Sequence, residues 1–218
     1  MHIPDGFLDL QTSIAAGVIS AGTVSYASYA LRRRVPPEKV PLMGVAGAFV
    51  FAAQMINFPV VGGTSGHLLG AALAAILLGP WAAVLVMTAV LVIQCFVFQD
   101  GGALALGANV LNMGVAGALL GYVTYTTVGK ISRRVSVRYA ASFLAAWVAV
   151  MAAAFLCSGE LIISGTAAPE VVLPAMLGVH ALIGAVEGII TVGALALVHG
   201  SRPDIWPALQ PAEVTQQK

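Results

Sequence analysis

Long apolar runs dominate this sequence, and they constrain its fold more than any other feature. Each run is about 20 residues long, which is the length that a helix needs to cross a bilayer. Lipid offers no partner to backbone N–H and C=O groups, so a chain in lipid must pair its backbone within helices or a closed barrel. We therefore expect an all-α polytopic membrane protein with seven transmembrane helices, in a single domain over residues 1–218. The expected spans lie near residues 10–31, 40–57, 64–79, 81–98, 103–128, 137–157 and 172–199, followed by a polar tail at 200–218.

The scarcity of charge excludes several classes of protein. Charged residues make up 9% of the chain, whereas soluble domains carry about 25%. The hydrophobic content of 59% is too high for a disordered chain. A formal net charge of +1 argues against a nucleic-acid partner. The chain contains no GxxxxGK[ST] motif, so we expect no P-loop ATP site within it.

The basic residues predict the orientation of the spans. With seven spans, all ten lie on one side, and the positive-inside rule makes that side cytoplasmic. The N-terminus is then outside and the C-terminus is cytoplasmic. The basic residues are Arg32, Arg33, Arg34, Lys39, Lys130, Arg133, Arg134, Arg138, Arg202 and Lys218. Five acidic residues are expected on the outer side: Asp5, Asp9, Asp100, Glu160 and Glu170.

The third run differs from the others because glycines interrupt it. It begins in VVGGTSGH and ends at Gly79-Pro80, so its uninterrupted helical part, from His67 to Gly79, is short. Irregular backbone at membrane depth is tolerated only inside a bundle or beside a cavity. We therefore expect irregular backbone in this segment, inside the bundle or beside a cavity.

The N-terminal segment, residues 1–9, begins with groups that can chelate a metal ion. The α-amine of Met1, the backbone nitrogen of His2 and Nδ1 of His2 can reach one ion through fused five- and six-membered rings. Pro4 stiffens the chain that follows. His67, expected on the same outer side, could supply a fourth nitrogen. Four nitrogens in a plane suit Ni(II) or Cu(II), and favour Co(II) less.

Binding of this kind should depend on pH. A terminal amine has a reference pKa of about 7.7–8.0, and it must lose its proton to bind a metal. The backbone amide must also be deprotonated. We therefore expect metal affinity to fall steeply in acid.

Other polar groups within the spans have two possible roles. They could orient the ligand imidazoles, or they could simply hydrogen-bond neighbouring helices. The candidates for the first role are Gln54, Asn57, Ser65, Gln94, Asn109, Asn112 and His180. Glu187, the only acid well inside a span, shares a helix face with His180 and is expected to pair with a polar neighbour.

Three sequence blocks resemble the CbiM/NikM family of cobalt- and nickel-specific S components of energy-coupling factor transporters. They are MHIPDGF at 1–7, FAAQMINFPV at 51–60 and GTSGHLLG at 63–70. The resemblance implies a seven-helix, multi-pass protein of the prokaryotic cell membrane that captures Ni2+ or Co2+ from outside and is not an enzyme. It implies Met1, His2 and His67 as metal ligands.

The same resemblance implies partner proteins. They are a transmembrane coupling protein, two ABC-type ATPase subunits and a small auxiliary membrane subunit. ATP-driven uptake would then depend on these partners, in agreement with the absence of a P-loop. Membrane lipid is the remaining partner.

Two alternatives remain open from the sequence. The motif Gly63-Thr64-Ser65-Gly66, together with His180, is similar to the Ser–His pair of rhomboid intramembrane proteases. Such an enzyme would leave the MHIPDG opening unexplained. The second alternative is an autonomous metal channel or carrier that needs no ATPase.

Overall fold

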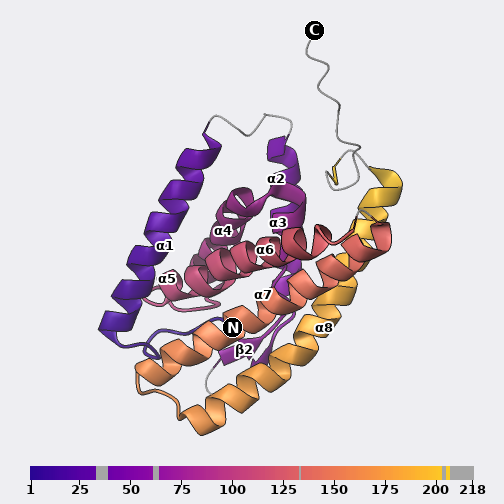
Figure 1. Cartoon of the computed structure of the whole chain (residues 1–218). Coiled ribbons are helices and arrows are strands. Elements are labelled where there is room, and N and C mark those ends of the chain that lie inside the picture. Colours follow the sequence, from indigo (N-terminus) through magenta and orange to yellow (C-terminus); the bar gives the residue numbers. More distant parts are fainter. Residues whose placement is uncertain (33–38, 61–63, 133, 203–204, 207–218) are drawn as a thin grey trace.

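The computed structural model describes residues 1–32, 39–60, 64–132, 134–202 and 205–206. Several residues used above lie outside these ranges: Arg33, Arg34, Gly63, Arg133, Lys218 and the rest of the tail from 207 onward. The chain is mostly helical, as predicted (Figure 1). One short antiparallel hairpin, which the sequence did not predict, pairs β1 (Phe58–Val60) with β2 (Thr64–Gly66).

Local signals set the helix boundaries. Helix α1 (Leu10–Leu31) begins where the Asp9 carboxylate accepts a hydrogen bond from the Thr12 N–H at 2.6 Å. Proline occupies the first turn of α2 (Val40–Gln54), α4 (Pro80–Phe98) and α8 (Pro169–Ser201), where its missing N–H costs nothing. The remaining elements are α3 (Ala71–Leu78), α5 (Leu106–Asn109), the π-helix η2 (Val110–Ala116), α6 (Gly117–Gly129) and α7 (Val135–Ile163).

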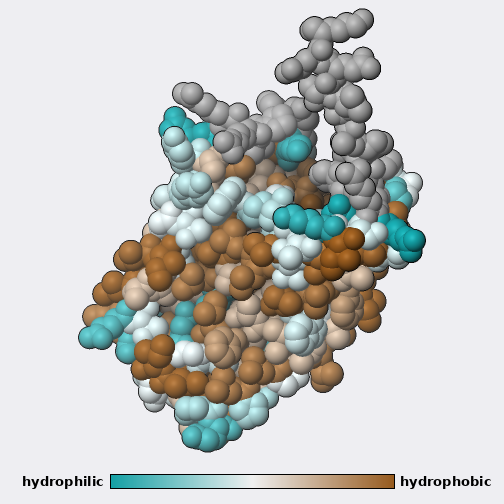
Figure 2. Space-filling view, in the orientation of Figure 1, coloured by the Kyte–Doolittle hydropathy of each residue, from teal (hydrophilic) through white to brown (hydrophobic). Residues whose placement is uncertain are grey.

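Five helical segments within the described ranges are long and apolar enough to cross a membrane. They are α1, α4, the continuous segment Leu106–Gly129, α7 and α8. Helix α2 is apolar but has 15 residues, and α3 has eight. The count of seven spans and the orientation of the termini therefore stay predictions. Figure 2 shows apolar side chains across the middle of one face and more hydrophilic ones toward its two ends.

Helix α3 lies inside the bundle and packs against α4, α6 and α7. Six of its eight residues are buried, from Ala71 to Ile76. Its small side chains allow close approach, because a Cβ at Gly121 of α6 would lie 2.9 Å from the Cβ of Ala72. The predicted span at 64–79 is therefore a strand, an irregular turn and a short helix. His67 begins this turn and is buried.

Candidate metal centre

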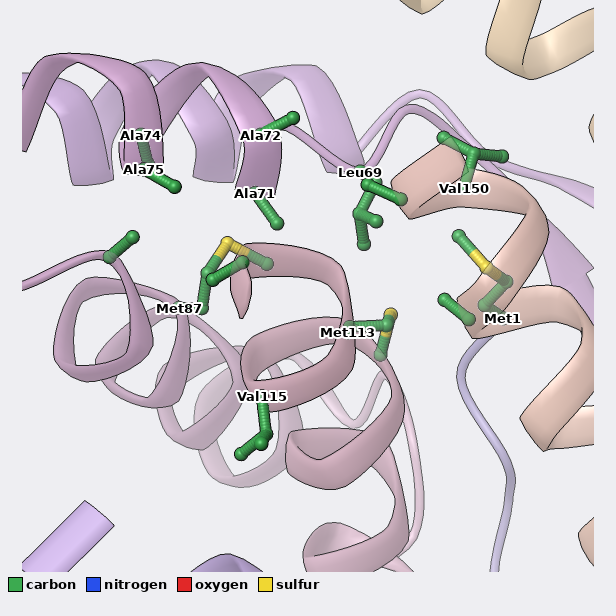
Figure 3. Packing of buried hydrophobic residues seen from close by; sticks show 14 of the residues in the cluster. Met1, Leu69, Ala71, Ala72, Ala74, Ala75, Met87, Met113, Val115 and Val150 are labelled. Carbon is green, nitrogen blue, oxygen red and sulfur yellow. The ribbon is translucent and has the colours of Figure 1, made fainter. Parts of the chain in front are cut away.

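The N-terminal segment enters the bundle instead of extending from it. Figure 1 shows the N-terminus near α7 and β2, and Met1, His2 and Ile3 are all buried. Figure 3 shows the Met1 side chain in the same region of the core as Leu69 and Val150. The first residues are thus part of the hydrophobic core.

The amine of Met1 is held by β2. It donates hydrogen bonds to the carbonyl oxygen of Ser65 and, at 3.1 Å, to the Ser65 hydroxyl. Burial lowers the pKa of this amine from 8.0 to about 5, because a charged amine would lose its water. The amine is therefore neutral at pH 7, and its lone pair is available to a metal.

The main chain just after the amine is also fixed. Asn109 accepts a hydrogen bond from the Ile3 N–H and donates one to the Ile3 carbonyl oxygen. The Gly102 N–H donates to the same carbonyl at 2.9 Å. The Asp5 carboxylate accepts from the N–H groups of Ala103 and Leu104, which anchors the end of the segment.

The hydrogen bonds of His2 determine which ring nitrogen is free. Nε2 of His2 lies 3.2 Å from Oε1 of Gln94, and because a carbonyl oxygen only accepts, Nε2 carries the hydrogen. The lone pair of the neutral ring is then on Nδ1. Burial lowers the pKa of His2 from 6.5 to about 3, so the ring is neutral at pH 7. Nδ1 is the nitrogen that a terminal chelate requires.

In His67 the free ring nitrogen is Nε2, whereas in His2 it is Nδ1. Its Nδ1 donates to the Leu68 carbonyl oxygen at 2.8 Å, which leaves the lone pair on Nε2. This Nε2 is buried, and no residue within the described ranges hydrogen-bonds it. The rings of His67 and His2 are stacked, with centroids 4.6 Å apart and planes 23° from parallel. The two histidines that the sequence nominated are therefore adjacent.

Helix α8 fixes the turn that carries His67. The Glu187 carboxylate accepts from the N–H groups of Leu69, at 2.5 Å, and Gly70, at 2.9 Å. Gln54 donates to the Leu69 carbonyl oxygen at 2.7 Å. Gly70 has a φ of +76°, which favours glycine, and a Cβ there would collide with Val50. The partner of Glu187 is thus the backbone beside His67.

The other polar candidates differ in how they contact this centre. Asn57 reaches it through Asp100, to which it donates at 3.2 Å. Asn112 donates to Glu160 at 2.6 Å and contacts none of the three candidate ligands through a hydrogen bond. Asn109, by contrast, hydrogen-bonds the main chain of Ile3, directly after His2. The π-helix begins between the two asparagines, at Val110.

Ser65 and His180 do not form a protease-like pair in the described part of the chain. The Ser65 hydroxyl accepts from the Met1 amine, and Nδ1 of His180 donates to the Met176 carbonyl oxygen at 2.7 Å. No hydrogen bond between the two side chains occurs among the residues that the structure describes.

Asp100 is a neighbour of the candidate centre that sequence reasoning did not single out. Its Oδ1 lies 3.2 Å from Nδ1 of His2, and burial raises the pKa of its carboxyl group. The sequence indicated only an acidic residue on the outer side. A carboxylate directly before Gly101-Gly102, where the chain turns, is the signal that could have identified it.

Side chains alone do not make a metal site here. Within the described ranges, no three side chains of His, Cys, Asp or Glu gather closely enough to hold an ion. A centre at this position therefore needs the amine and the main chain in addition to the two imidazoles.

Comparisons with known proteins identify relatives that are metal transport proteins. The family model described as "Cobalt uptake substrate-specific transmembrane region", CbiM, matches residues 2–205. The chain is 44% identical, over 94% of its length and 68% of the relative's, to the "Putative fused nickel transport protein NikMN" of Archaeoglobus fulgidus. It is 41% identical to a "Putative metal transport protein" of Haloquadratum walsbyi, over 94% of this chain and 93% of that one.

A solved structure shares the fold. It is described as the crystal structure of a truncated transition metal transporter, with a TM-score of 0.87 and 32% sequence identity. The match covers 92% of this chain and 99% of the other.

Proposed function

Since this chain belongs to the CbiM family of cobalt uptake substrate-specific transmembrane regions, we propose that it captures a divalent transition metal ion for import. In this proposal it is the S component of an energy-coupling factor transporter, and Ni2+ is its preferred substrate over Co2+. It binds the ion from outside the cell membrane and catalyses no reaction itself.

The proposed ligands are the Met1 amine, the backbone nitrogen and Nδ1 of His2, and Nε2 of His67. One observation carries this proposal: each imidazole has its hydrogen directed to an acceptor, at Gln94 and Leu68, and its lone pair left free. Orienting hydrogen bonds of this kind are what ligating histidines use to fix the tautomer. The stacked rings bring both lone-pair nitrogens into one region.

The preference for nickel follows from the type of donor. Four nitrogens, one of them a deprotonated amide, favour a square-planar arrangement, which suits Ni(II) better than Co(II). The nickel-transport name of the 44% identical relative supports the same assignment. Cobalt transport stays the alternative.

Transport would require partners that supply energy. We propose the transmembrane coupling protein, two ABC-type ATPases and a small auxiliary membrane subunit implied by the family resemblance. The N-terminus would face outside and the C-terminus the cytoplasm. If the chain is instead an autonomous carrier, proteoliposomes that contain it alone will accumulate nickel.

The decisive experiment measures Ni2+ binding to the purified chain by calorimetry. His2→Ala, His67→Ala and a variant with one residue added before Met1 should each lose specific binding while remaining helical by circular dichroism. His199→Ala, far along α8 from the centre, is the matched control and should bind like the wild type. Unchanged binding by His2→Ala would refute the proposed ligand set.

A further inference from the structure

A cavity of about 570 Å³ lies next to the candidate metal centre. Its lining includes His2 and Ser65 of the centre and the carboxylates of Asp5 and Asp100. The other polar residues of its lining are Asn57, Cys95 and Gln99. An ion on its way to His2 would pass through a space bordered by two acidic groups.

Asp100 and His2 place two hydrogen-bond acceptors opposite each other, an arrangement that a cation between them would stabilise. Nδ1 of His2 carries a lone pair, because Nε2 donates to Gln94, and it has no hydrogen-bond donor of its own. Oδ1 of Asp100 is 3.2 Å away and is also an acceptor. Two acceptors at this separation repel each other unless a positive ion or a proton lies between them. The His2 side chain is only 3% exposed, so Nδ1 is largely shielded from bulk solvent.

Of the two carboxylates, Asp100 accepts fewer hydrogen bonds from the described residues and is better able to bind an ion. Both oxygens of Asp5 accept backbone N–H groups, from Ala103 and Leu104. Asp100 accepts one hydrogen bond, from Asn57 to Oδ2. Its side chain is 18% exposed, so it borders both the cavity and the buried ring. A group in this position can exchange contacts with solvent for contacts with His2.

We propose that Asp100 is an outer binding site for the incoming hydrated divalent cation, which it holds in the cavity and passes to Nδ1 of His2. The proposal rests on the function proposed above for Met1, His2 and His67. The carboxylate oxygen suits an ion that still carries water, and the nitrogens then replace oxygen ligands one by one. No covalent bond changes as the ion moves from Asp100 to Nδ1 of His2, and the later binding of the His2 backbone nitrogen releases its amide proton to solvent. The charge of Asp100 accelerates capture, and the nitrogen ligands determine retention.

The test is the kinetics of Ni2+ binding to the full chain in detergent, by stopped-flow absorption of the bound ion. Asp100→Asn keeps the size of the side chain and removes its charge. The association rate constant should fall roughly ten-fold, and its dependence on ionic strength should weaken, as expected when a steering charge is lost. The dissociation rate constant should stay within about two-fold of the wild type, since the nitrogen ligands are intact.

Three further variants make the result specific. Glu170→Gln removes a carboxylate charge from the exposed first turn of α8, outside the cavity lining, and should leave both rate constants unchanged. Asp100→Glu should restore fast association. Asp100→Ser removes the carboxylate without introducing an amide, and should slow association as Asp100→Asn does. If one of these two variants folds poorly, the other still tests the outer site.

The outcomes separate this inference from the proposed function. Unchanged association in Asp100→Asn and Asp100→Ser would overturn the outer site, as would a change confined to dissociation, which would make Asp100 part of the final site. If His2→Ala and His67→Ala then still lose equilibrium binding, the proposed function stands. Retained binding in both histidine variants would instead refute the proposed function.

Discussion

Asn109 hydrogen-bonds both polar groups of the Ile3 main chain, accepting from the N–H at 2.8 Å and donating to the carbonyl oxygen at 3.1 Å. All of these atoms are buried, where an unpaired backbone group is costly. One side chain of α5 thus supplies the partners that a neighbouring strand would otherwise provide. It fixes the chain immediately after His2.

Asn109→Asp should weaken nickel binding by about 10–100-fold, the range measured for residues that orient metal ligands. The aspartate keeps the acceptor for the Ile3 N–H but turns a second acceptor toward the Ile3 carbonyl oxygen. Calorimetry gives the affinity. Gln11→Glu makes the same amide-to-carboxylate change at an exposed position of α1 and should have no effect. Equal affinities for the two variants would show that Asn109 does not position the chelate.

Glu187→Gln should reduce both thermal stability and metal affinity. A glutamine can accept from only one of the Leu69 and Gly70 N–H groups and turns its own NH2 toward the other. A buried donor left unpaired costs about 1–3 kcal/mol. The melting temperature and the nickel affinity are measured together, with Glu170→Gln, exposed in the first turn of α8, as the control. A stable variant with unchanged affinity would contradict the positioning role of Glu187.

Gly102→Ala should displace the N-terminal segment without unfolding the helices. A Cβ at Gly102 would collide with the backbone nitrogen and carboxylate of Asp5, which anchors that segment. Nickel affinity should fall at least ten-fold, as for loss of other positioning contacts. The matched control is Gly159→Ala in α7, where an added Cβ meets nothing within 4 Å. The control should retain affinity and gain about 0.5–1 kcal/mol of stability, the usual effect of this change inside a helix.

Nickel binding near pH 7 should release about one proton. The Met1 amine, with its pKa near 5, and the His2 ring, with its pKa near 3, are already neutral there, so only the amide proton of His2 must leave. An exposed amine with an ordinary pKa would release close to a second proton. Calorimetry in buffers of different ionisation enthalpy counts the protons. The buried amine thus shifts the steepest acid dependence below the range expected from the sequence.

The same shifts make the metal-free protein less stable in acid. The unfolded chain takes up a proton on the amine below pH 8.0, whereas the folded chain does so only below about 5. Stability should therefore decline as the pH falls from 8 to 5, and the amine should contribute no further loss below that. The His2 ring adds a second decline between pH 6.5 and about 3. Denaturant unfolding at a series of pH values checks both windows, and a flat profile from pH 8 to 5 would show that the amine is not buried.

The sequence nominated Met1, His2 and His67, which the structure brings together, but it did not predict the contacts that hold them. Hydropathy located the helices, and the chemistry of an amine next to His2 selected the chelate. Glu187 could not be assigned to the turn at Leu69, because the two residues are separated by 118 positions and periodicity does not reveal which helices become neighbours. The short length of α3 was only partly predictable. The Gly79-Pro80 stop is visible in the sequence, but the left-handed turn at Gly70 depends on tertiary contacts.

The burial of the N-terminal segment has a consequence for biosynthesis. Early residues of the chain have partners that are made much later: Ile3 pairs with Asn109, and the Phe7 carbonyl oxygen accepts a hydrogen bond from the Thr166 hydroxyl. Helices α1 to α7 must therefore be made before the segment can dock, and each contact closes a long loop. Nascent chains released before Thr166 would contain His2 and His67 but could not complete the docking of the segment. The docking of the N-terminal segment is thus completed only after most of the chain has been made.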